Sequence, residues 1–123
     1  MSLRCLIVDD NAGFLRSARF LLESEGLRVV AVASTGDDAL REGEALSPDV
    51  VLVDIDLGGE SGFDLVDRLD GRTGTSRSDV ILISTHAEED FADLIAACGV
   101  AGFIPKSQIT AGSIQRLLDR SKG

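Results

Sequence analysis

Carboxylates stand directly after two of the apolar runs of the sequence. Asp9 and Asp10 follow the first run, and Asp54 follows the third. If folding brings these three side chains together, they repel one another and raise one another's pKa, unless a cation keeps them ionised. Oxygen ligands without histidine or cysteine select a hard ion, and the hard ion that keeps several waters and accepts phosphate oxygens is Mg²⁺. The acids therefore predict a magnesium site.

A hydroxyl group and an amine follow two later apolar runs. Ser84 ends the fourth run, and Lys106 closely follows the fifth. A metal ion, an ammonium and a hydroxyl are the groups that neutralise the three oxygens of a phosphoryl group in transfer, with Asp54 as the in-line nucleophile. Taken singly, acids at a strand end more often cap the next helix. The joint occurrence of these groups favours phosphoryl transfer.

These groups can meet only if the apolar runs are parallel strands. Five short apolar runs alternate with segments whose apolar residues recur at helical spacing, which is typical of an α/β domain with a parallel sheet. The carboxyl ends of parallel strands lie along one edge of the sheet, so we expect a single crevice there. The expected strands comprise residues 5–8, 27–33, 49–54, 80–84 and 100–104.

Caps and turn residues bound the helices between these strands. Asp10 or Asn11 can cap the first helix and Gly26 ends it, while Thr35 opens the second. The polar, turn-rich segment 71–78 is expected to be a mobile loop. The apolar positions expected to face the core are Phe14, Ala18, Leu21 and Leu22 in the first helix, Phe63, Val66 and Leu69 in the third, Phe91, Leu94, Ile95 and Cys98 in the fourth, and Ile114, Leu117 and Leu118 in the last.

Length and composition limit the function further. The 123 residues fit one domain, 1–123, and a net charge of −9 argues against nucleic-acid binding by these residues, so we expect proteins or cations as partners. Cys5 and Cys98 lack metal-ligand spacing and are expected to be reduced thiols of a cytoplasmic protein. We expect no membrane span and no export signal, because no apolar run approaches the roughly 18 residues that a span needs.

Four segments hold the residues with chemical potential, and together they resemble a known family. They are Val8-Asp9-Asp10-Asn11, Val53-Asp54-Ile55-Asp56 with the later Gly62, Ile83-Ser84-Thr85, and Gly102-Phe103-Ile104-Pro105-Lys106. Over essentially its whole length the sequence is similar to the receiver (CheY-like) domain of bacterial two-component response regulators. This resemblance implies a flavodoxin-like (βα)5 sandwich with strand order 2-1-3-4-5. It also implies that the phosphohistidine of a sensor histidine kinase phosphorylates Asp54.

The resemblance assigns roles at the metal site. It implies that Asp10, Asp54 and the backbone carbonyl of Asp56 hold Mg²⁺. Asp9 would act on the ion largely through water, and Lys106 matches the lysine of the phosphorylation site. The chain would then be a signalling receiver rather than an enzyme, because it catalyses only its own phosphorylation and dephosphorylation.

The resemblance also implies a switch and an output face. Ser84 and Phe103 match a pair in which the hydroxyl moves onto the phosphoryl group and the aromatic ring turns inward. The face of the fourth helix, fifth strand and fifth helix is expected to bind a downstream effector or the protein's own output domain, or to form a phosphorylation-dependent homodimer. The segment 57–63 resembles regulators with a LuxR/NarL-type helix-turn-helix output domain, and we expect no such domain within residues 1–123.

Three positions depart from the family pattern. Leu57-Gly58 replaces a frequent Met-Pro pair, so we expect a more flexible loop that holds the metal-binding carbonyl less rigidly. Ser107 replaces the proline that often follows the lysine in a cis bond, which leaves the geometry of the Lys106-Ser107 bond open. Phe103 lacks the hydroxyl of the frequent tyrosine, so its switching would be steric.

Two further residues should flank the mouth of the crevice. Asp56 lies two positions after Asp54, and His86 lies two positions after Ser84. We hypothesise that both influence how water reaches the acyl phosphate and so tune its lifetime. A simpler interpretation makes His86 a solvated residue at the start of the fourth helix and Asp56 one more acid of the metal site.

Two other classes of protein compete with this interpretation. A haloacid dehalogenase-type phosphohydrolase shares the Asp-x-Asp motif of residues 54–56, but its metal acids lie downstream and a threonine usually stands where this chain has Gly58. A flavodoxin-like flavin-binding module needs a hydroxyl- and glycine-rich loop after the first strand, where this chain has Asp9-Asp10-Asn11. Multiple turnover of a phosphomonoester would favour the first class, and a yellow purified protein the second.

Overall fold

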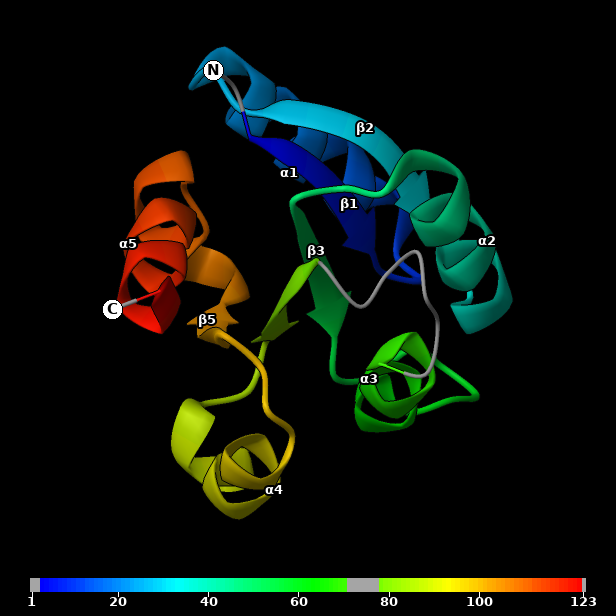
Figure 1. Ribbon diagram of the computed structural model, residues 1–123, viewed down its shortest axis with the longest axis vertical. Coiled ribbons are helices and arrows are strands. Elements are labelled where there is room, and N and C mark those ends of the chain that lie inside the picture. The colour runs from blue at the N-terminus through cyan, green and yellow to red at the C-terminus, as the bar shows by residue number, and fades with distance from the viewer. Residues whose placement is uncertain (1–2, 71–77, 123) are drawn as a thin grey trace.

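Strands and helices alternate along the chain in a computed structural model, which describes residues 3–70 and 78–122 (Figure 1). The strands are β1 (Arg4–Val8), β2 (Arg28–Ala33), β3 (Val50–Asp54), β4 (Asp79–Ser84) and β5 (Gly102–Pro105). The helices are α1 (Ala12–Ser24), α2 (Gly36–Leu46), α3 (Gly62–Asp70), α4 (Ala92–Ala97) and α5 (Ala111–Lys122). Two 3₁₀ turns, η1 (Glu88–Phe91) and η2 (Lys106–Gln108), precede α4 and follow β5.

The five strands form one parallel sheet with the order β2-β1-β3-β4-β5. This order confirms the predicted flavodoxin-like (βα)5 fold. The register aligns the carboxyl ends of the central strands, since Val8 pairs with Val53 and Asp54 pairs with Ile83. The residues that follow β1, β3 and β4 therefore leave the sheet along one edge.

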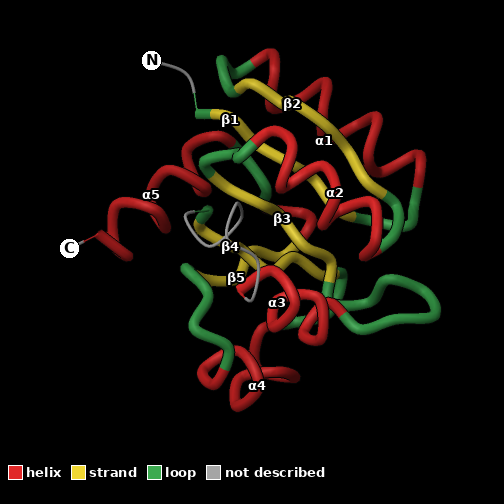
Figure 2. Tube along the Cα trace, turned by 45° about the vertical axis from the view of Figure 1, so that its right-hand side comes forward, coloured by secondary structure: helices red, strands yellow, loops and turns green. Residues whose placement is uncertain are grey.

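Helices cover both faces of the sheet (Figures 1 and 2). Side chains alternate between the two faces along a strand. Ile7 therefore packs into one core with α1 and α5, whereas Leu6 and Val8 pack into the other core with α2, α3 and residues of η1 and α4. Burial on both faces explains why the central strands read as continuous apolar runs. It also fixes the backbone from which the site residues project.

The caps expected from the sequence are present. Asn11 caps α1, because its Oδ1 accepts a hydrogen bond from Phe14 N at 3.0 Å, and Thr35 caps α2 in the same way. Gly26 and Gly99 have φ angles of 93° and 69°, a left-handed conformation that glycine adopts without strain. These two glycines therefore end the segments of α1 and α4 as predicted.

The buried face of α1 differs from the prediction. Its buried residues are Leu15, Ala18 and Leu22, which lie three and four positions apart on one stripe. Leu21, which was expected in the core, is 41% exposed. A helix with 3.6 residues per turn places Leu21 beside this stripe rather than on it.

The fourth helical segment is also different from the prediction. It is split into η1 and α4, and α4 contains no buried residue. Phe91, Ile95 and Cys98 pack partly against the second core, but Leu94 is 54% exposed, so its expected burial is wrong. Phe91, Ile95 and Cys98 have the i, i+4, i+7 spacing of one helical stripe, and Leu94 lies at the margin of that stripe.

Element boundaries shift by one or two residues from those expected. Strands β2, β3, β4 and β5 begin at Arg28, Val50, Asp79 and Gly102. Most of the segment predicted to be a mobile loop, residues 71–77, lies outside the described residues. Of the helices in the described ranges, none is long and apolar enough to cross a membrane.

Candidate functional site

Asp54 is the last residue of β3, and its surroundings fix its position closely. It is only 5% exposed, and its Oδ1 accepts a hydrogen bond from the N–H of Asp56 at 3.1 Å. A Cβ at Gly62 would lie 2.2 Å from the Asp54 carbonyl oxygen, a distance that no side chain can occupy. Glycine at position 62 therefore lets α3 begin directly against the end of β3.

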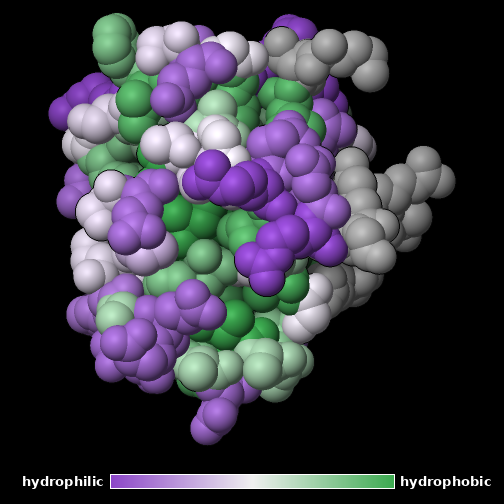
Figure 3. All heavy atoms as spheres, turned by 90° about the vertical axis from the view of Figure 1, so that its left-hand side faces the viewer, coloured by the Kyte–Doolittle hydropathy of each residue, from purple (hydrophilic) through white to green (hydrophobic). Residues whose placement is uncertain are grey.

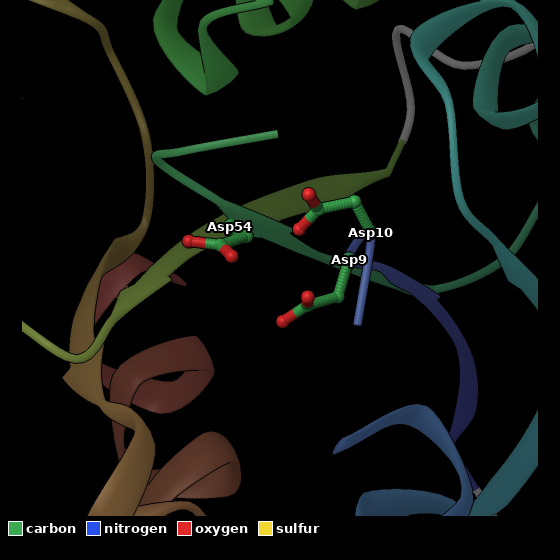
Figure 4. Close-up of side chains that lie close together, drawn as sticks. All are labelled: Asp9, Asp10 and Asp54. Carbon is green, nitrogen blue, oxygen red and sulfur yellow. The ribbon is translucent and has the colours of Figure 1, made fainter. Parts of the chain in front are cut away.

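Asp9 and Asp10 follow β1, the neighbour of β3 in the sheet. Asp9 is fully buried, with its Oδ1 accepting a hydrogen bond from Asn11 N at 2.8 Å, whereas Asp10 is exposed. Figure 4 shows the carboxylates of Asp9, Asp10 and Asp54 grouped beyond the ends of the two strands. One oxygen from each lies within 4.8 Å of the others. The three acids expected at one edge of the sheet do meet there.

This donor set fits a hard divalent cation. Among the described residues, Asp9 Oδ2 is a buried side-chain oxygen whose one contact is a short ion pair with Lys106. A Cβ at Gly58 would lie 3.0 Å from Asp10 Oδ2, so glycine leaves the space beside that carboxylate open. A buried oxygen with a cation as its one partner, beside two further carboxylates, suits a metal ion that takes oxygen ligands alone.

Lys106, the first residue of η2, brings a positive charge to these acids. Its Nζ lies 3.0 Å from Asp54 Oδ2 and 2.5 Å from Asp9 Oδ2, and its side chain is 14% exposed. The same Nζ lies 4.4 Å from the centroid of the Phe14 ring. No described peptide bond is cis, so the bond between Lys106 and Ser107, whose geometry the sequence leaves open, is trans.

Burial and charge act in opposite directions on the two paired groups. Burial raises the pKa of the Asp54 carboxyl and the charge of Asp9 adds to this, while hydrogen bonds from Lys106 and Asp56 oppose it. Burial lowers the pKa of Lys106, but its contacts with Asp9 and Asp54 raise it by more, so that the net shift is upward. Lys106 is therefore charged at neutral pH, and a divalent cation bound here would favour the ionised form of Asp54.

Ser84 is the last residue of β4, and Phe103 lies in the neighbouring strand β5. Ser84 is 3% exposed, and its Oγ accepts a hydrogen bond from His86 N at 2.9 Å. Phe103 is 7% exposed and belongs to the second core. Its ring is thus already packed inward in the unphosphorylated chain, and the expected inward turn on phosphorylation remains a prediction.

A cavity of about 490 Å³ lies between the loops that follow β3 and β4. Asp56, Ser84 and His86 are among its lining residues. The exposed His86 stacks on Phe91, with ring centroids 5.9 Å apart and an angle of 20° between the ring planes. Asp56 and His86 thus share one cavity with the buried hydroxyl of Ser84.

The glycine-rich loop after β3 closes on itself. Leu57 N donates a hydrogen bond to Glu60 O at 3.0 Å, and Asp56 and Ser61 form an antiparallel bridge. The Oε1 of Glu60 accepts a hydrogen bond from Gly36 N at 2.5 Å, which ties the loop to the first turn of α2. The loop therefore has specific contacts, and its expected flexibility remains a prediction.

Sequence reasoning missed two neighbours of the site, Phe14 and Glu60. The helical spacing predicts only that Phe14 faces the core, although its position four residues after Asp10 indicates that it lies at the same end of the sheet. Glu60 gave no such signal, because its partner Gly36 lies 24 positions away.

The protein is thus an α/β domain with a binding site at the carboxyl edge of its parallel sheet. Three carboxylates there can bind a cation, and the lysine beside them can bind an anion. Residues 5–118 match the response regulator receiver domain family, and the chain belongs to that family. This membership favours the receiver over the phosphohydrolase and the flavin-binding module.

Known proteins of this family are similar in sequence and structure. The chain is 32% identical over 119 residues to the response regulator GacA of Pseudomonas viridiflava, covering 94% of this chain and 53% of GacA. It superposes on the receiver domain of NarL from Mycobacterium tuberculosis with a TM-score of 0.82 and 28% identity, over 99% of this chain and 98% of that one. The chain spans about half the length of the curated relatives it matches.

A third similar protein contains a modified aspartate. It is a response regulator protein from Burkholderia pseudomallei, whose crystal structure holds a phosphorylated aspartic acid, a calcium ion and citrate. The TM-score is 0.80 at 25% identity, over 95% of this chain and 66% of that one.

Proposed function

We propose that this chain is a phosphoacceptor in two-component signalling, and that Asp54 takes a phosphoryl group from the phosphohistidine of a sensor histidine kinase. One observation carries the proposal: the buried Asp54 lies within 4.8 Å of the other two acids and 3.0 Å from the ammonium of Lys106. Family membership supports a histidine kinase as the partner. The phosphorylated aspartate of the Burkholderia pseudomallei protein supports the same chemistry here.

The proposed cofactor is Mg²⁺. Asp10, Asp54 and the backbone carbonyl of Asp56 would hold it, with Asp9 acting largely through water. When bound, the ion would neutralise oxygens of the phosphoryl group and orient it. The hydrogen bond from Asp56 N to Asp54 Oδ1 keeps this stretch of backbone beside the phosphoacceptor.

The chain's own residues supply the rest of the transfer. A carboxylate oxygen of Asp54 forms a bond to phosphorus in line as the bond between phosphorus and the histidine nitrogen breaks, and the imidazole nitrogen keeps the electron pair. The ammonium of Lys106 neutralises charge on the phosphoryl oxygens. The hydroxyl of Ser84 donates a hydrogen bond to one of them. The chain thus promotes only its own phosphorylation and dephosphorylation.

We assign the output to the face formed by α4, β5 and α5. Two hollows of about 460 and 350 Å³ on this side share Phe103, Leu117 and Arg120 in their walls. Figure 3 shows apolar surface between hydrophilic side chains on this side of the molecule. A downstream effector, the protein's own output domain or a second phosphorylated copy would bind here. Relatives about twice the length of this chain support a further output segment.

We also propose that Asp56 and His86 tune the lifetime of the acyl phosphate. Both line the cavity beside Ser84, where water would approach the phosphoryl group. Decay of the phosphorylated protein after removal of the donor measures this directly. Dephosphorylation rates that stay unchanged in Asp56→Asn and His86→Ala would contradict this role.

Incubation with Mg²⁺ and acetyl phosphate tests the main proposal. Intact mass should show one phosphoryl adduct, which disappears in Asp54→Asn and on chelation of the metal. Mass fragmentation should place the adduct on Asp54. An adduct that persists in Asp54→Asn, or no adduct at all, would reject Asp54 as the phosphoacceptor.

A further inference from the structure

The ammonium of Lys106 has an aromatic neighbour in addition to its two acids. Its Nζ lies 4.4 Å from the centroid of the Phe14 ring, within the range of about 6 Å in which a cation is attracted to a ring face. Phe14 is half-buried and packs against the first core, so the ring does not depend on Lys106 for its place. The ring is thus a third partner of the ammonium, and core packing places it independently of the two acids.

Short contacts link Phe14 to the same acid that Lys106 contacts. Asn11 N donates a hydrogen bond to Asp9 Oδ1 at 2.8 Å, and Phe14 N donates one to Asn11 Oδ1 at 3.0 Å. Lys106 Nζ lies 2.5 Å from Asp9 Oδ2. Asp9, Asn11, Phe14 and Lys106 therefore form a closed set of contacts, which fixes the backbone from which the Phe14 side chain reaches the ammonium.

We propose that Phe14 is a positioning residue that keeps the ammonium of Lys106 in the crevice when a divalent cation occupies the acids. This inference rests on the proposed function. Of the two carboxylates that hold Lys106, Asp54 would be a ligand of the bound cation and Asp9 would contact it through water, and the cation repels the ammonium. An aromatic face attracts an ammonium but is no ligand for a hard metal ion. Phe14 is therefore a partner that the metal ion does not compete for.

A spectroscopic test addresses the contact itself. The chain has two lysines, Lys106 and Lys122, so ¹³C-lysine labelling gives two sets of ε-methylene signals. The ring of Phe14 should shift the Lys106 signals upfield relative to those of Lys122, both without and with saturating Mg²⁺. Phe14→Leu should abolish this shift. Loss of the shift on addition of Mg²⁺ to the wild-type protein would overturn the proposal.

A kinetic test addresses the consequence. At saturating Mg²⁺ and with acetyl phosphate as the donor, Phe14→Leu should slow phosphorylation of Asp54 about three- to tenfold, the effect of one cation–π contact. Phe14→Tyr keeps the ring and should stay within about twofold of the wild-type rate. Phe20→Leu is the matched control, because Phe20 is in the same helix and 77% exposed, and it should leave the rate unchanged.

Fluorinated phenylalanine at position 14 separates charge attraction from packing. Added fluorine weakens the attraction of the ring face with little change in size, so the rate should fall stepwise with the number of fluorine atoms. This series also covers the case in which Phe14→Leu does not fold. A rate independent of fluorination, or equal rates in Phe14→Leu and the wild type, would overturn the role of Phe14.

Failure of this inference differs from failure of the proposed function. If wild-type protein forms no Asp54 adduct, the proposed function is rejected. If it forms the adduct and Phe14→Leu forms it equally fast, only the role of Phe14 is rejected. The lysine spectrum decides the contact in either case.

Discussion

The carboxyl edge of the sheet carries two groups of residues that are built differently, called here the acid half and the α4 half; they interleave, because β4 lies between β3 and β5. In the acid half, after β1, β3 and β5, Asp9, Asp54 and Lys106 are ion-paired, and no side chain of the three is more than 14% exposed. In the α4 half, after β4, residues 85–90 are all exposed and α4 has no buried residue. Tight packing and charge fix the first half, whereas the second has few contacts to lose. Chemistry that needs exact placement fits the first, and movement at low cost fits the second.

Ser84, the last residue of β4, connects the two groups. It is buried and directly follows Ile83, the strand partner of Asp54, but the next residues of the chain are exposed, and its Oγ already accepts a hydrogen bond from His86 N. If Ser84 donates a hydrogen bond to a phosphoryl group on Asp54, the movement of Ser84 would therefore displace the residues of the α4 half that follow it. Moving a two-state domain from 1:99 to 99:1 requires about 5.5 kcal/mol, which a few charge-assisted contacts supply.

The largest expected effect tests the acid half. Lys106→Met removes the ammonium 3.0 Å from Asp54 Oδ2 and keeps an unbranched side chain. Phosphorylation should slow about 10²- to 10³-fold, as when a preorganised donor at a developing charge is lost. Intact mass over time, with acetyl phosphate and saturating Mg²⁺, measures the rate. A loss smaller than about threefold would mean that the ammonium does not serve the chemistry, and the division of roles between the halves would not hold.

A matched pair of leucines tests the packing difference directly. Leu52 in β3 is 0% exposed, and Leu94 in α4 is 54% exposed. Leu52→Ala should lower the free energy of unfolding by about 2–5 kcal/mol, because it leaves a cavity between two packed layers, whereas Leu94→Ala should change it by less than about 0.5 kcal/mol. Urea titrations at one pH measure both values. Similar losses in the two variants would show that the α4 half is packed as firmly as the acid half.

The same contrast explains how much the sequence could predict. Strands buried on both faces read as apolar runs, so the sheet, the positions of Asp9, Asp10 and Asp54 at its edge, and the caps at Asn11 and Thr35 could all be predicted. These features depend on the local sequence pattern and on the rule that the carboxyl ends of parallel strands lie along one edge of the sheet.

Features that depend on contacts between distant segments could not be predicted in this way. The contact of Phe14 with Lys106 joins α1 to the end of β5, and the bond from Gly36 to Glu60 joins α2 to the loop after β3. The prediction for the α4 half is wrong for another reason. Its apolar residues have helical spacing, but Leu94 lies at the margin of the stripe formed by Phe91, Ile95 and Cys98 and is 54% exposed.

The smallest expected effect tests whether the ionised carboxylate of Asp54 destabilises the folded protein. Because the pKa of Asp54 is raised in the folded protein, the folded state binds a proton there more tightly than the unfolded state does. Asp54 therefore lowers stability as pH rises from its unfolded pKa of 3.8 through its folded pKa, and the loss is complete above that window. Asp54→Asn removes this loss while Asp9 still pairs with Lys106.

Asp54→Asn should accordingly unfold at a higher temperature than the wild type at pH 7 without divalent cations, and the difference should shrink as the pH falls below 3.8. Comparison at each pH isolates Asp54, because all other titrating groups are common to both proteins. Mg²⁺ should stabilise the wild type more than the variant, since it binds the folded site through this carboxylate. A variant less stable than the wild type at pH 7 would mean that the pair with Lys106 outweighs burial and repulsion. The acid half would then be stable in its own right and would not need a bound cation to offset its charge.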